Sequence, residues 1–403
     1  MGKDGSKMIS KKMTALVNNS SVIRAMFEEG KRLAGIYGPE NVFDFSLGNP
    51  NVPAPAAVND AIRHIVDAEE STTIHGYMSN AGFEDVRDRI AASVNRRFGT
   101  NFSTDNIVMT VGAAGGINVL FKAIINPGDE IIAFAPYFGE YRAYADNVDA
   151  KLVVVPPHIP DFQPDLDNFE KLITPKTRAV IINTPNNPTG VIYSEATLGA
   201  MAQILERKQQ EYGSEIILFS DEPYRELAYD NAVVPYVTKY YKNTVVGYSY
   251  SKSLSLPGER IGYLVLPGEM DDAENIISAC NVATRILGFV NAPSLMQKVA
   301  AECVDIDVSE NVAIYNRNRE ALFSGLTEAG FECVKPEGAF YMFVKTPVDD
   351  TEFAAMAKKH NILVVPGSTF ACPGYVRIAY CVAYDTIVNS LPGFRELAKE
   401  LGL

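Results

Sequence analysis

The chain has 403 residues, of which 47% are hydrophobic and 21% are charged, so it can bury a large core. Its formal net charge of −13 argues against binding to nucleic acid or to an anionic membrane surface. No apolar run is long enough to span a bilayer, and the four histidines are too dispersed to suggest a metal site. The five cysteines form no CxxC pair, which favours reduced thiols and a cytoplasmic protein.

Residues 1–12 are polar and are expected to be flexible. From about residue 105 to residue 265, short β-rich runs alternate with amphipathic stretches such as Leu198–Tyr212. The runs are apolar on both faces, as strands between two layers of helices must be. They are Asn106–Val111, Glu130–Ala135, Leu152–Val155, Ala179–Asn183, Ile216–Ser220, Val245–Ser249 and Ile261–Leu266. This alternation predicts an α/β fold with a mostly parallel sheet of about seven strands and helices on both faces.

After about residue 290 the pattern changes to that of a smaller α+β domain. In chain order we expect a helical stretch over 295–329 that ends at Gly330, a strand pair over 331–335 and 340–345, a helix near 351–360, a strand over 375–380 and a last helix near 384–400. The predicted division is a large domain of residues 50–290 and a small domain made of residues 13–49 and 291–403. The Pro-rich stretch Asn49–Pro55 is the expected crossing between them.

Polar or small residues follow several predicted strands at the carboxyl edge, where open α/β sheets bind ligands. Gly112–Gly116 leads from the first strand into a helix, and its backbone amides suit an anion, although such turns more often serve packing. Asn183–Gly190 has no hydrophobic residue, and its three asparagines and two prolines favour a pinned functional loop over a plain turn.

Two charged residues stand out at the same edge. Asp221 follows the strand over 216–220, where a carboxylate is costly without a partner unless it caps a helix. Lys252 is flanked by hydroxyls, and desolvation with nearby cations lowers a lysine pKa, as a Schiff-base amine requires. Arg260 follows eight positions later and is placed to reach a shared phosphate.

The segments Asn183–Gly190, Asp221–Tyr224 and Ser249–Tyr263, in this order and spacing, resemble the class I/II aminotransferases, which are pyridoxal-phosphate (PLP) enzymes of fold type I. The resemblance covers roughly residues 35 to 400. It implies that Lys252 holds PLP as a Schiff base and then acts as general base and acid. It implies further that Asp221 pairs with the pyridine nitrogen, and that Asn187 and Tyr224 bind the phenolic oxygen.

The resemblance also assigns the remaining cofactor contacts. The phosphate is expected on the backbone amides of Ala113 and Ala114, with Ser249, Ser251 and Arg260 around it. Phe138 is expected to stack on the ring face, with a core aromatic as the alternative, and Tyr141 to support Asp221. Tyr77 matches a tyrosine that reaches the phosphate of a neighbouring subunit, which implies a homodimer with shared active sites.

On the substrate side, Arg377 lies in an otherwise apolar strand and matches the arginine that clamps the α-carboxylate. Asn187 is expected to assist it. Gly48 belongs to a loop that closes over the substrate in the family, although the usual acidic residue nearby is missing. Arg285 lies near the position of an arginine that binds distal carboxylates from the other subunit; the offset differs by one residue, and a surface arginine is at least as good an interpretation.

The implied reaction is a ping-pong transfer of the amino group of an L-amino acid to a 2-oxo acid. Aspartate or glutamate is one candidate substrate, and an aromatic or kynurenine-type substrate is another. A PLP-dependent carbon–sulfur β-lyase is the alternative reaction, because motifs that hold PLP do not separate the two.

Overall fold

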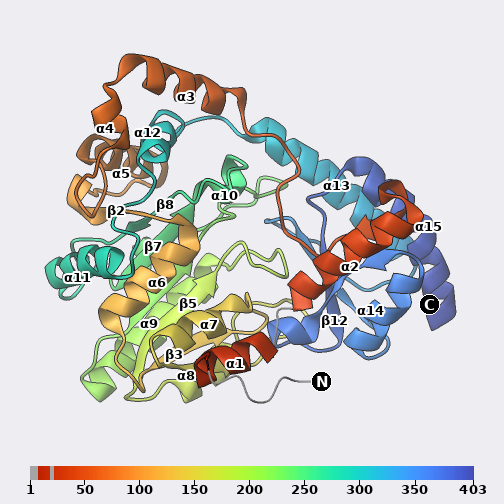
Figure 1. Ribbon diagram of the computed structural model, residues 1–403. Coiled ribbons are helices and arrows are strands. Elements are labelled where there is room, and N and C mark those ends of the chain that lie inside the picture. Colours follow the sequence, from red (N-terminus) through yellow and green to blue (C-terminus); the bar gives the residue numbers. More distant parts are fainter. Residues whose placement is uncertain (1–7, 19–21) are drawn as a thin grey trace.

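The computed structural model describes residues 8–18 and 22–403, and a seven-stranded sheet forms its centre (Figure 1). The strands lie in the order β2-β8-β7-β6-β5-β3-β4, and only β8 runs antiparallel to its neighbours. The predicted mostly parallel sheet of seven strands is therefore confirmed. Its strands are β2 (Ile107–Thr110), β3 (Glu130–Phe134), β4 (Lys151–Val155), β5 (Thr177–Asn183), β6 (Ile217–Asp221), β7 (Thr244–Ser249) and β8 (Gly262–Val265).

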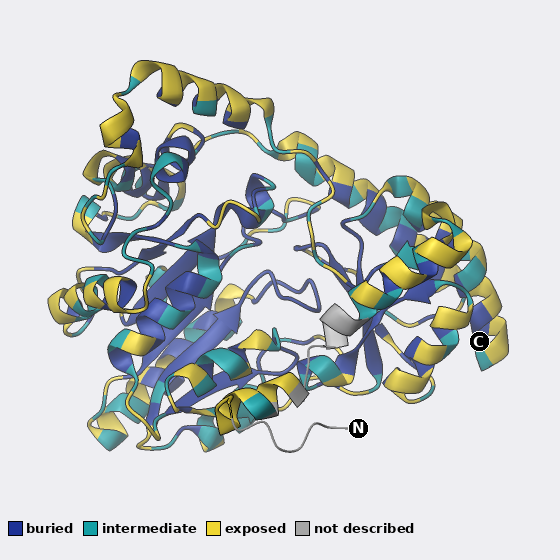
Figure 2. Ribbon diagram, in the orientation of Figure 1, coloured by how far each residue is buried: buried dark blue, intermediate teal, exposed yellow. Residues whose placement is uncertain are grey.

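Helices bury both faces of this sheet, which is why its strands are apolar throughout (Figure 2). Alternate residues of β3 illustrate the two sides: Ile131 packs with Phe121 of α6, whereas Ile132 packs with Phe169 of α8. The first face carries α6 (Gly112–Ile124), α7 (Glu140–Asn147) and α11 (Ala273–Ile286). The second face carries α8 (Leu166–Leu172) and α9 (Glu195–Tyr212), then α3 (Ala56–Ala68), α4 (Ser71–His75), α5 (Glu84–Phe98) and α12 (Ser294–Glu302).

A smaller unit packs beside the large sheet around a core that includes Leu322, Phe340 and Ile378. It contains an antiparallel sheet in the order β11-β12-β9 and a parallel pair, β1 with β10. These strands are β1 (Phe43–Asp44), β9 (Tyr341–Lys345), β10 (Ile362–Leu363), β11 (Val365–Pro366) and β12 (Tyr375–Ala379). Its helices are α2 (Val22–Tyr37), α13 (Ser309–Glu328), α14 (Asp350–Lys359) and α15 (Tyr384–Leu401).

The helical stretch expected over 295–329 is wrong as one helix, since α12 and α13 are separate. The Asp307 carboxylate accepts hydrogen bonds from the backbone N–H of Ser309 at 2.9 Å and from its hydroxyl at 2.9 Å. Such a local bond competes with the helical ladder and starts a new helix. The apolar periodicity continues across the break between α12 and α13, so the sequence pattern did not reveal this break.

The strand expected over 331–335 is also wrong. This segment makes only an isolated bridge between Cys333 and Val344, and β9 pairs instead with β12. The reason lies just beyond it: the backbone N–H groups of Glu337 and Gly338 donate to the Gly190 carbonyl of the large unit, at 3.0 and 2.9 Å. Because of these two bonds, the segment before β9 runs toward the large unit and does not pair as a strand of the small sheet.

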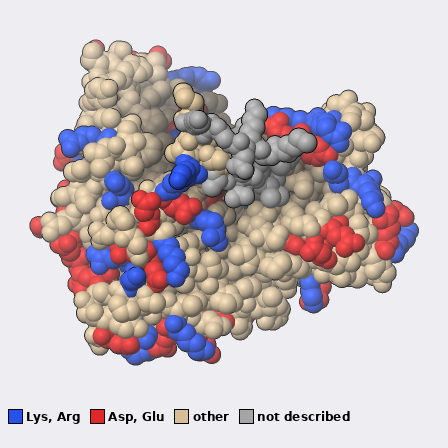
Figure 3. Space-filling model, turned by 60° about the horizontal axis from the view of Figure 1, so that its bottom comes forward, with Lys and Arg blue, Asp and Glu red and all other residues tan. Residues whose placement is uncertain are grey.

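Residues Asn49–Pro55 carry the chain from β1 of the small unit to α3 of the large one (Figure 1). Of the segment expected to be flexible, residues 1–7 lie outside the described residues, and α1 (Lys11–Asn18) begins within it. None of the helices that the structure describes is long and apolar enough to cross a membrane. On the described surface in Figure 3, acidic and basic side chains are interspersed.

Candidate active site

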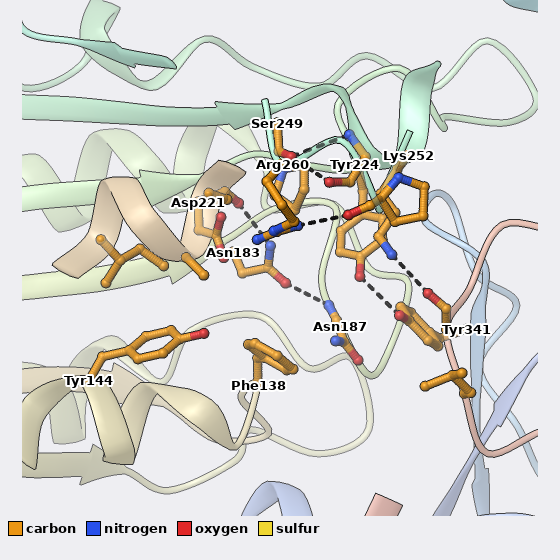
Figure 4. A pocket seen from close by; sticks show the side chains of 18 of the residues that line it. Phe138, Tyr144, Asn183, Asn187, Asp221, Tyr224, Ser249, Lys252, Arg260 and Tyr341 are labelled. Atoms are coloured by element: carbon orange, nitrogen blue, oxygen red, sulfur yellow. Dashed lines mark hydrogen bonds between the residues drawn. The ribbon is translucent and has the colours of Figure 1, made fainter. Parts of the chain in front are cut away.

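A cavity of about 340 Å³ opens at the carboxyl ends of β5, β6 and β7, and both units contribute to its walls (Figure 4). Twelve of the fourteen residues assigned above to catalysis or binding line it, from seven separate chain segments. They are Gly48, Ala113, Ala114, Phe138, Asn187, Asp221, Tyr224, Ser249, Ser251, Lys252, Arg260 and Arg377. The structure therefore brings together residues that lie up to several hundred positions apart in the sequence.

Lys252 sits in α10 (Tyr250–Ser253), a single turn that starts where β7 ends. Its Nζ donates to the Gly48 carbonyl at 2.8 Å, so the amine faces the loop from the small unit. The pKa of Lys252 is lowered to about 8, mainly by burial and to a smaller extent by the guanidinium groups of Arg377 and Arg260. An amine with this pKa is available in its neutral, nucleophilic form near neutral pH.

Asp221 ends β6 in the floor of the pocket and is 5% exposed. Its Oδ2 accepts a hydrogen bond of 2.6 Å from the Tyr141 hydroxyl, whereas its buried Oδ1 has no partner among the described residues. Burial raises the pKa of Asp221 to about 7, against the opposite effect of the Tyr141 bond. A buried oxygen without a donor is costly, so this position is suited to a ligand that brings a proton or a positive charge.

One end of the pocket is suited to an anion. The first-turn amides of α6, including those of Ala113 and Ala114, have no partners within the helix. Arg260 lies against them so closely that a Cβ at Gly112 would stand 2.8 Å from its guanidinium. Ser249 and Ser251 add two hydroxyls that lie 2.8 Å apart.

Arg260 also holds an unusual backbone conformation, with φ of +52°. A non-glycine residue rarely occupies this left-handed region unless its surroundings demand it. The loop before Arg260 thus directs the guanidinium back toward the start of α6.

The Asn183–Gly190 loop is buried and pinned by its own side chains. Asn183 donates to the Asp221 carbonyl at 2.8 Å and accepts from the backbone N–H of Asn187 at 2.7 Å. Asn186 accepts from the backbone and the hydroxyl of Thr189, at 3.1 and 2.8 Å. These bonds fix Asn187 in the pocket wall, where its Oδ1 also accepts from Arg377.

Arg377 is a buried cation, 2% exposed, on β12 of the small unit. It donates to Asn187 Oδ1 at 3.1 Å and to the Ser46 carbonyl at 2.6 Å, and its Nε has no partner among the described residues. No described carboxylate lies within 4.0 Å of it, and burial lowers its pKa. An uncompensated buried charge is expensive, so the site is built to receive an anion.

Two aromatic residues of the pocket were absent from the sequence-based set. Tyr341 lines the wall beside Arg377, and Tyr144 lies opposite, near Phe138 (Figure 4). Tyr341 could not be recognised from the sequence as a pocket residue, because it begins a strand whose residues have the apolar pattern of an ordinary buried strand. A buried tyrosine hydroxyl does require a partner, and that was the only available signal.

Tyr77 and Arg285 do not line the pocket. Tyr77 is 90% exposed, and Arg285 is exposed in the last turn of α11. The two regions are neighbours, because Asn291 hydrogen-bonds the backbone of Met78 and Ser79. Around them the apolar side chains of Val282, Ile286 and Leu287 are also exposed.

Comparison with known proteins shows what this arrangement is similar to. The model of the family "Aminotransferase class I and II" matches residues 40–388. The aspartate aminotransferase of Thermotoga maritima is 28% identical over 390 residues, which cover 95% of this chain and 97% of the relative. The probable aspartate/prephenate aminotransferase of Thermus aquaticus is 30% identical over 359 residues, covering 87% and 90%.

Solved structures agree. An aminotransferase from Eubacterium rectale has a TM-score of 0.95 at 46% identity, covering 98% of this chain and 100% of the other. The aspartate aminotransferase of Thermus thermophilus, solved with maleate, has a TM-score of 0.86 at 26% identity, covering 96% and 99%. The family match spans most of the chain, and the fold is shared over nearly its whole length. The protein therefore belongs to the class I and II aminotransferase family, and it is an aminotransferase, as its sequence motifs predicted.

Proposed function

We propose that the protein binds PLP at Lys252 and transfers the amino group of an L-amino acid to a 2-oxo acid by a ping-pong mechanism. One observation carries this proposal. Among the described residues, one oxygen of the buried Asp221 carboxylate has no donor and the buried Arg377 guanidinium has no anion. The Lys252 amine lines the same pocket. A cofactor with a protonated ring nitrogen and a substrate with a carboxylate would satisfy both.

The chemistry of the donor set fits PLP. Asp221 Oδ1 would accept from the pyridine nitrogen, and the start of α6 with Ser249, Ser251 and Arg260 would hold the phosphate. Phe138 would cover the ring face, and Tyr224 with Asn187 would donate to the phenolic oxygen. When bound, PLP supplies an electron sink for negative charge that develops at the α-carbon of the amino acid.

The chain's own residues then perform three tasks. Arg377, with Asn187 beside it, binds the α-carboxylate and orients the amino acid. Lys252, with its pKa near 8, would hold the cofactor through its neutral amine until the substrate's amino group displaces it; the freed amine would then take a proton from the α-carbon and return it. Tyr141 holds the Asp221 carboxylate in place.

We also propose a homodimer whose active sites are shared. The exposed patch that contains Tyr77, at 90% exposure, and Ile286, at 57%, is more apolar than an isolated surface needs. A second copy placed on it with two-fold symmetry would bring its Tyr77 and Arg285 toward this pocket. Each site would then be complete only in the dimer.

Aspartate is the amino donor that we propose first. Several relatives are named aspartate aminotransferases. Among the described residues that line the pocket, the basic ones are Lys252, Arg260 and Arg377, and all three already have a role. A distal carboxylate would therefore need Arg285 of a second copy.

Two further proposals concern organisation and location. We propose a large domain of residues 50–290 and a small domain of residues 13–49 and 291–403, each with its own sheet and core. The exception is α12, which lies in the small-domain range but packs against the large sheet. We place the protein in the cytoplasm because its five cysteines are all free.

The test is an absorbance titration of the PLP-loaded protein with a panel of amino acids. We expect a visible band that shifts toward the ultraviolet as the amino group is transferred, with the largest response to aspartate and glutamate. A band that survives dialysis and borohydride treatment of the Lys252→Ala variant would refute the role of Lys252. Pyruvate and ammonia released from cystathionine without a 2-oxo acid would favour a carbon–sulfur β-lyase instead.

A further inference from the structure

Tyr341 stands where the cofactor side and the substrate side of the pocket meet. It begins β9 of the small unit and is 2% exposed. Its hydroxyl lies 2.9 Å from the Tyr224 hydroxyl, and either oxygen can be the donor. Its ring lies 4.6 Å from the Arg377 guanidinium carbon, within cation–π distance.

The loop that contacts Lys252 also depends on Tyr341. A Cβ at Gly48 would stand 1.9 Å from the Tyr341 hydroxyl oxygen, so only glycine allows this approach. The Gly48 carbonyl in turn accepts from Lys252 Nζ. One side chain therefore contacts Tyr224, Arg377 and the loop whose Gly48 carbonyl accepts from Lys252.

We propose that Tyr341 is a positioning residue of this active site: its hydroxyl donates to Tyr224, and its ring supports Arg377. This inference rests on the proposed PLP function and adds a residue outside the three segments on which the family resemblance was based. Tyr224 has one hydroxyl proton. When the Tyr224 hydroxyl donates its hydrogen bond to the phenolic oxygen of the cofactor, its own oxygen is left to accept from the Tyr341 hydroxyl. A hydrogen-bond chain of this kind strengthens its members.

The two contributions can be separated because one belongs to the hydroxyl and the other to the ring. Donation from Tyr224 withdraws negative charge from the phenolic oxygen, and that charge would otherwise hold a proton on the neighbouring nitrogen. Loss of the Tyr341 hydroxyl should therefore raise the pH midpoint of the visible band of the Lys252-bound cofactor. Loss of the ring should weaken binding of the amino acid's carboxylate at Arg377.

The experiment compares Tyr341→Phe with Tyr341→Leu in the PLP-loaded protein. In Tyr341→Phe we expect the pH midpoint of the band to rise by about half a unit, with KM for the amino acid unchanged. In Tyr341→Leu we expect KM to rise roughly tenfold as well. The control is Tyr229→Phe, which removes a buried hydroxyl from the same core, bonded to the Ala339 carbonyl and outside the pocket; it should leave both values at wild type.

A double-mutant cycle distinguishes loss of the Tyr341–Tyr224 hydrogen bond from a general loss of folding. In a Tyr224→Phe background, Tyr341→Phe should no longer move the midpoint, because its acceptor is gone. A midpoint at the wild-type value in Tyr341→Phe alone, or an equal shift in both backgrounds, would overturn the inference. A wild-type protein without a pH-dependent visible band would instead overturn the proposed PLP function.

Discussion

The proposed cofactor side and the proposed substrate side of the pocket are built in different ways. On the cofactor side, Asn187, Asp221 and Lys252 follow three neighbouring parallel strands, so the sheet itself brings them together. On the substrate side, Gly48 and Arg377 come from a loop and a strand of the small unit, more than three hundred residues apart. The cofactor side is thus a property of one sheet, whereas the substrate side depends on how two units pack.

The largest expected effect tests the cofactor side. Lys252→Ala should reduce transamination by at least about 10⁴-fold, since it removes both the nucleophile and the proton carrier. The measurement is the spectral shift on addition of amino acid. Lys242→Ala, which changes an exposed lysine paired with Asp271, is the matched control and should retain wild-type rates. A comparable loss of activity in the control variant would contradict a specific catalytic role of Lys252.

The next effect tests the substrate side. Arg377→Ala should raise KM for the amino acid roughly 100-fold, because the carboxylate loses a buried bidentate partner. The visible band of the bound cofactor should persist, since Arg377 lies on the other side of the pocket. Arg377→Lys keeps the charge without the planar fork and should recover only part of the affinity. Loss of the band together with affinity would show that the two sides are not separable.

A smaller effect concerns stability without the cofactor. The Asp221 carboxyl has a pKa of about 7 in the fold and releases its proton near pH 3.8 in an ordinary setting, so the folded state binds this proton more tightly. The contribution of Asp221 to stability is therefore full below about pH 4 and is lost as pH rises toward 7.

Asp221→Asn removes this titration. In cofactor-free protein, its unfolding free energy relative to wild type should increase between pH 4 and pH 7, by an amount on the order of a few kcal/mol. Denaturant unfolding at several pH values measures it. A constant difference across this range would show that Asp221 is not buried without a partner in the cofactor-free protein.

The smallest effect probes the proposed subunit interface. Arg285→Ala should raise KM for aspartate several-fold and leave KM for alanine unchanged, because only aspartate has a distal carboxylate. Arg207→Ala, at an exposed arginine paired with Glu170, is the control. An unchanged ratio of aspartate to alanine activity would leave Arg285 as a surface residue.

The local patterns of the chain predicted the large sheet well and the small unit less well. The large sheet follows from apolar runs that are buried on both faces, a signal that needs no knowledge of distant partners. In the small unit, the helix break at Asp307 and the loss of a strand before Glu337 both depend on hydrogen bonds of individual side chains or of the Gly190 loop. Periodicity carries no information about such bonds.

By itself, the sequence determined the family and the residues at the carboxyl edge of the sheet. The carboxyl ends of neighbouring parallel strands lie at the same edge, however the rest of the chain is arranged. The tertiary structure alone decided that Tyr341 meets Tyr224, that Gly48 accepts from Lys252, and that Arg377 is buried away from every described carboxylate. These contacts join segments that do not belong to the same sheet. They exist because the cores of the two units pack against each other, and only that packing sets those distances.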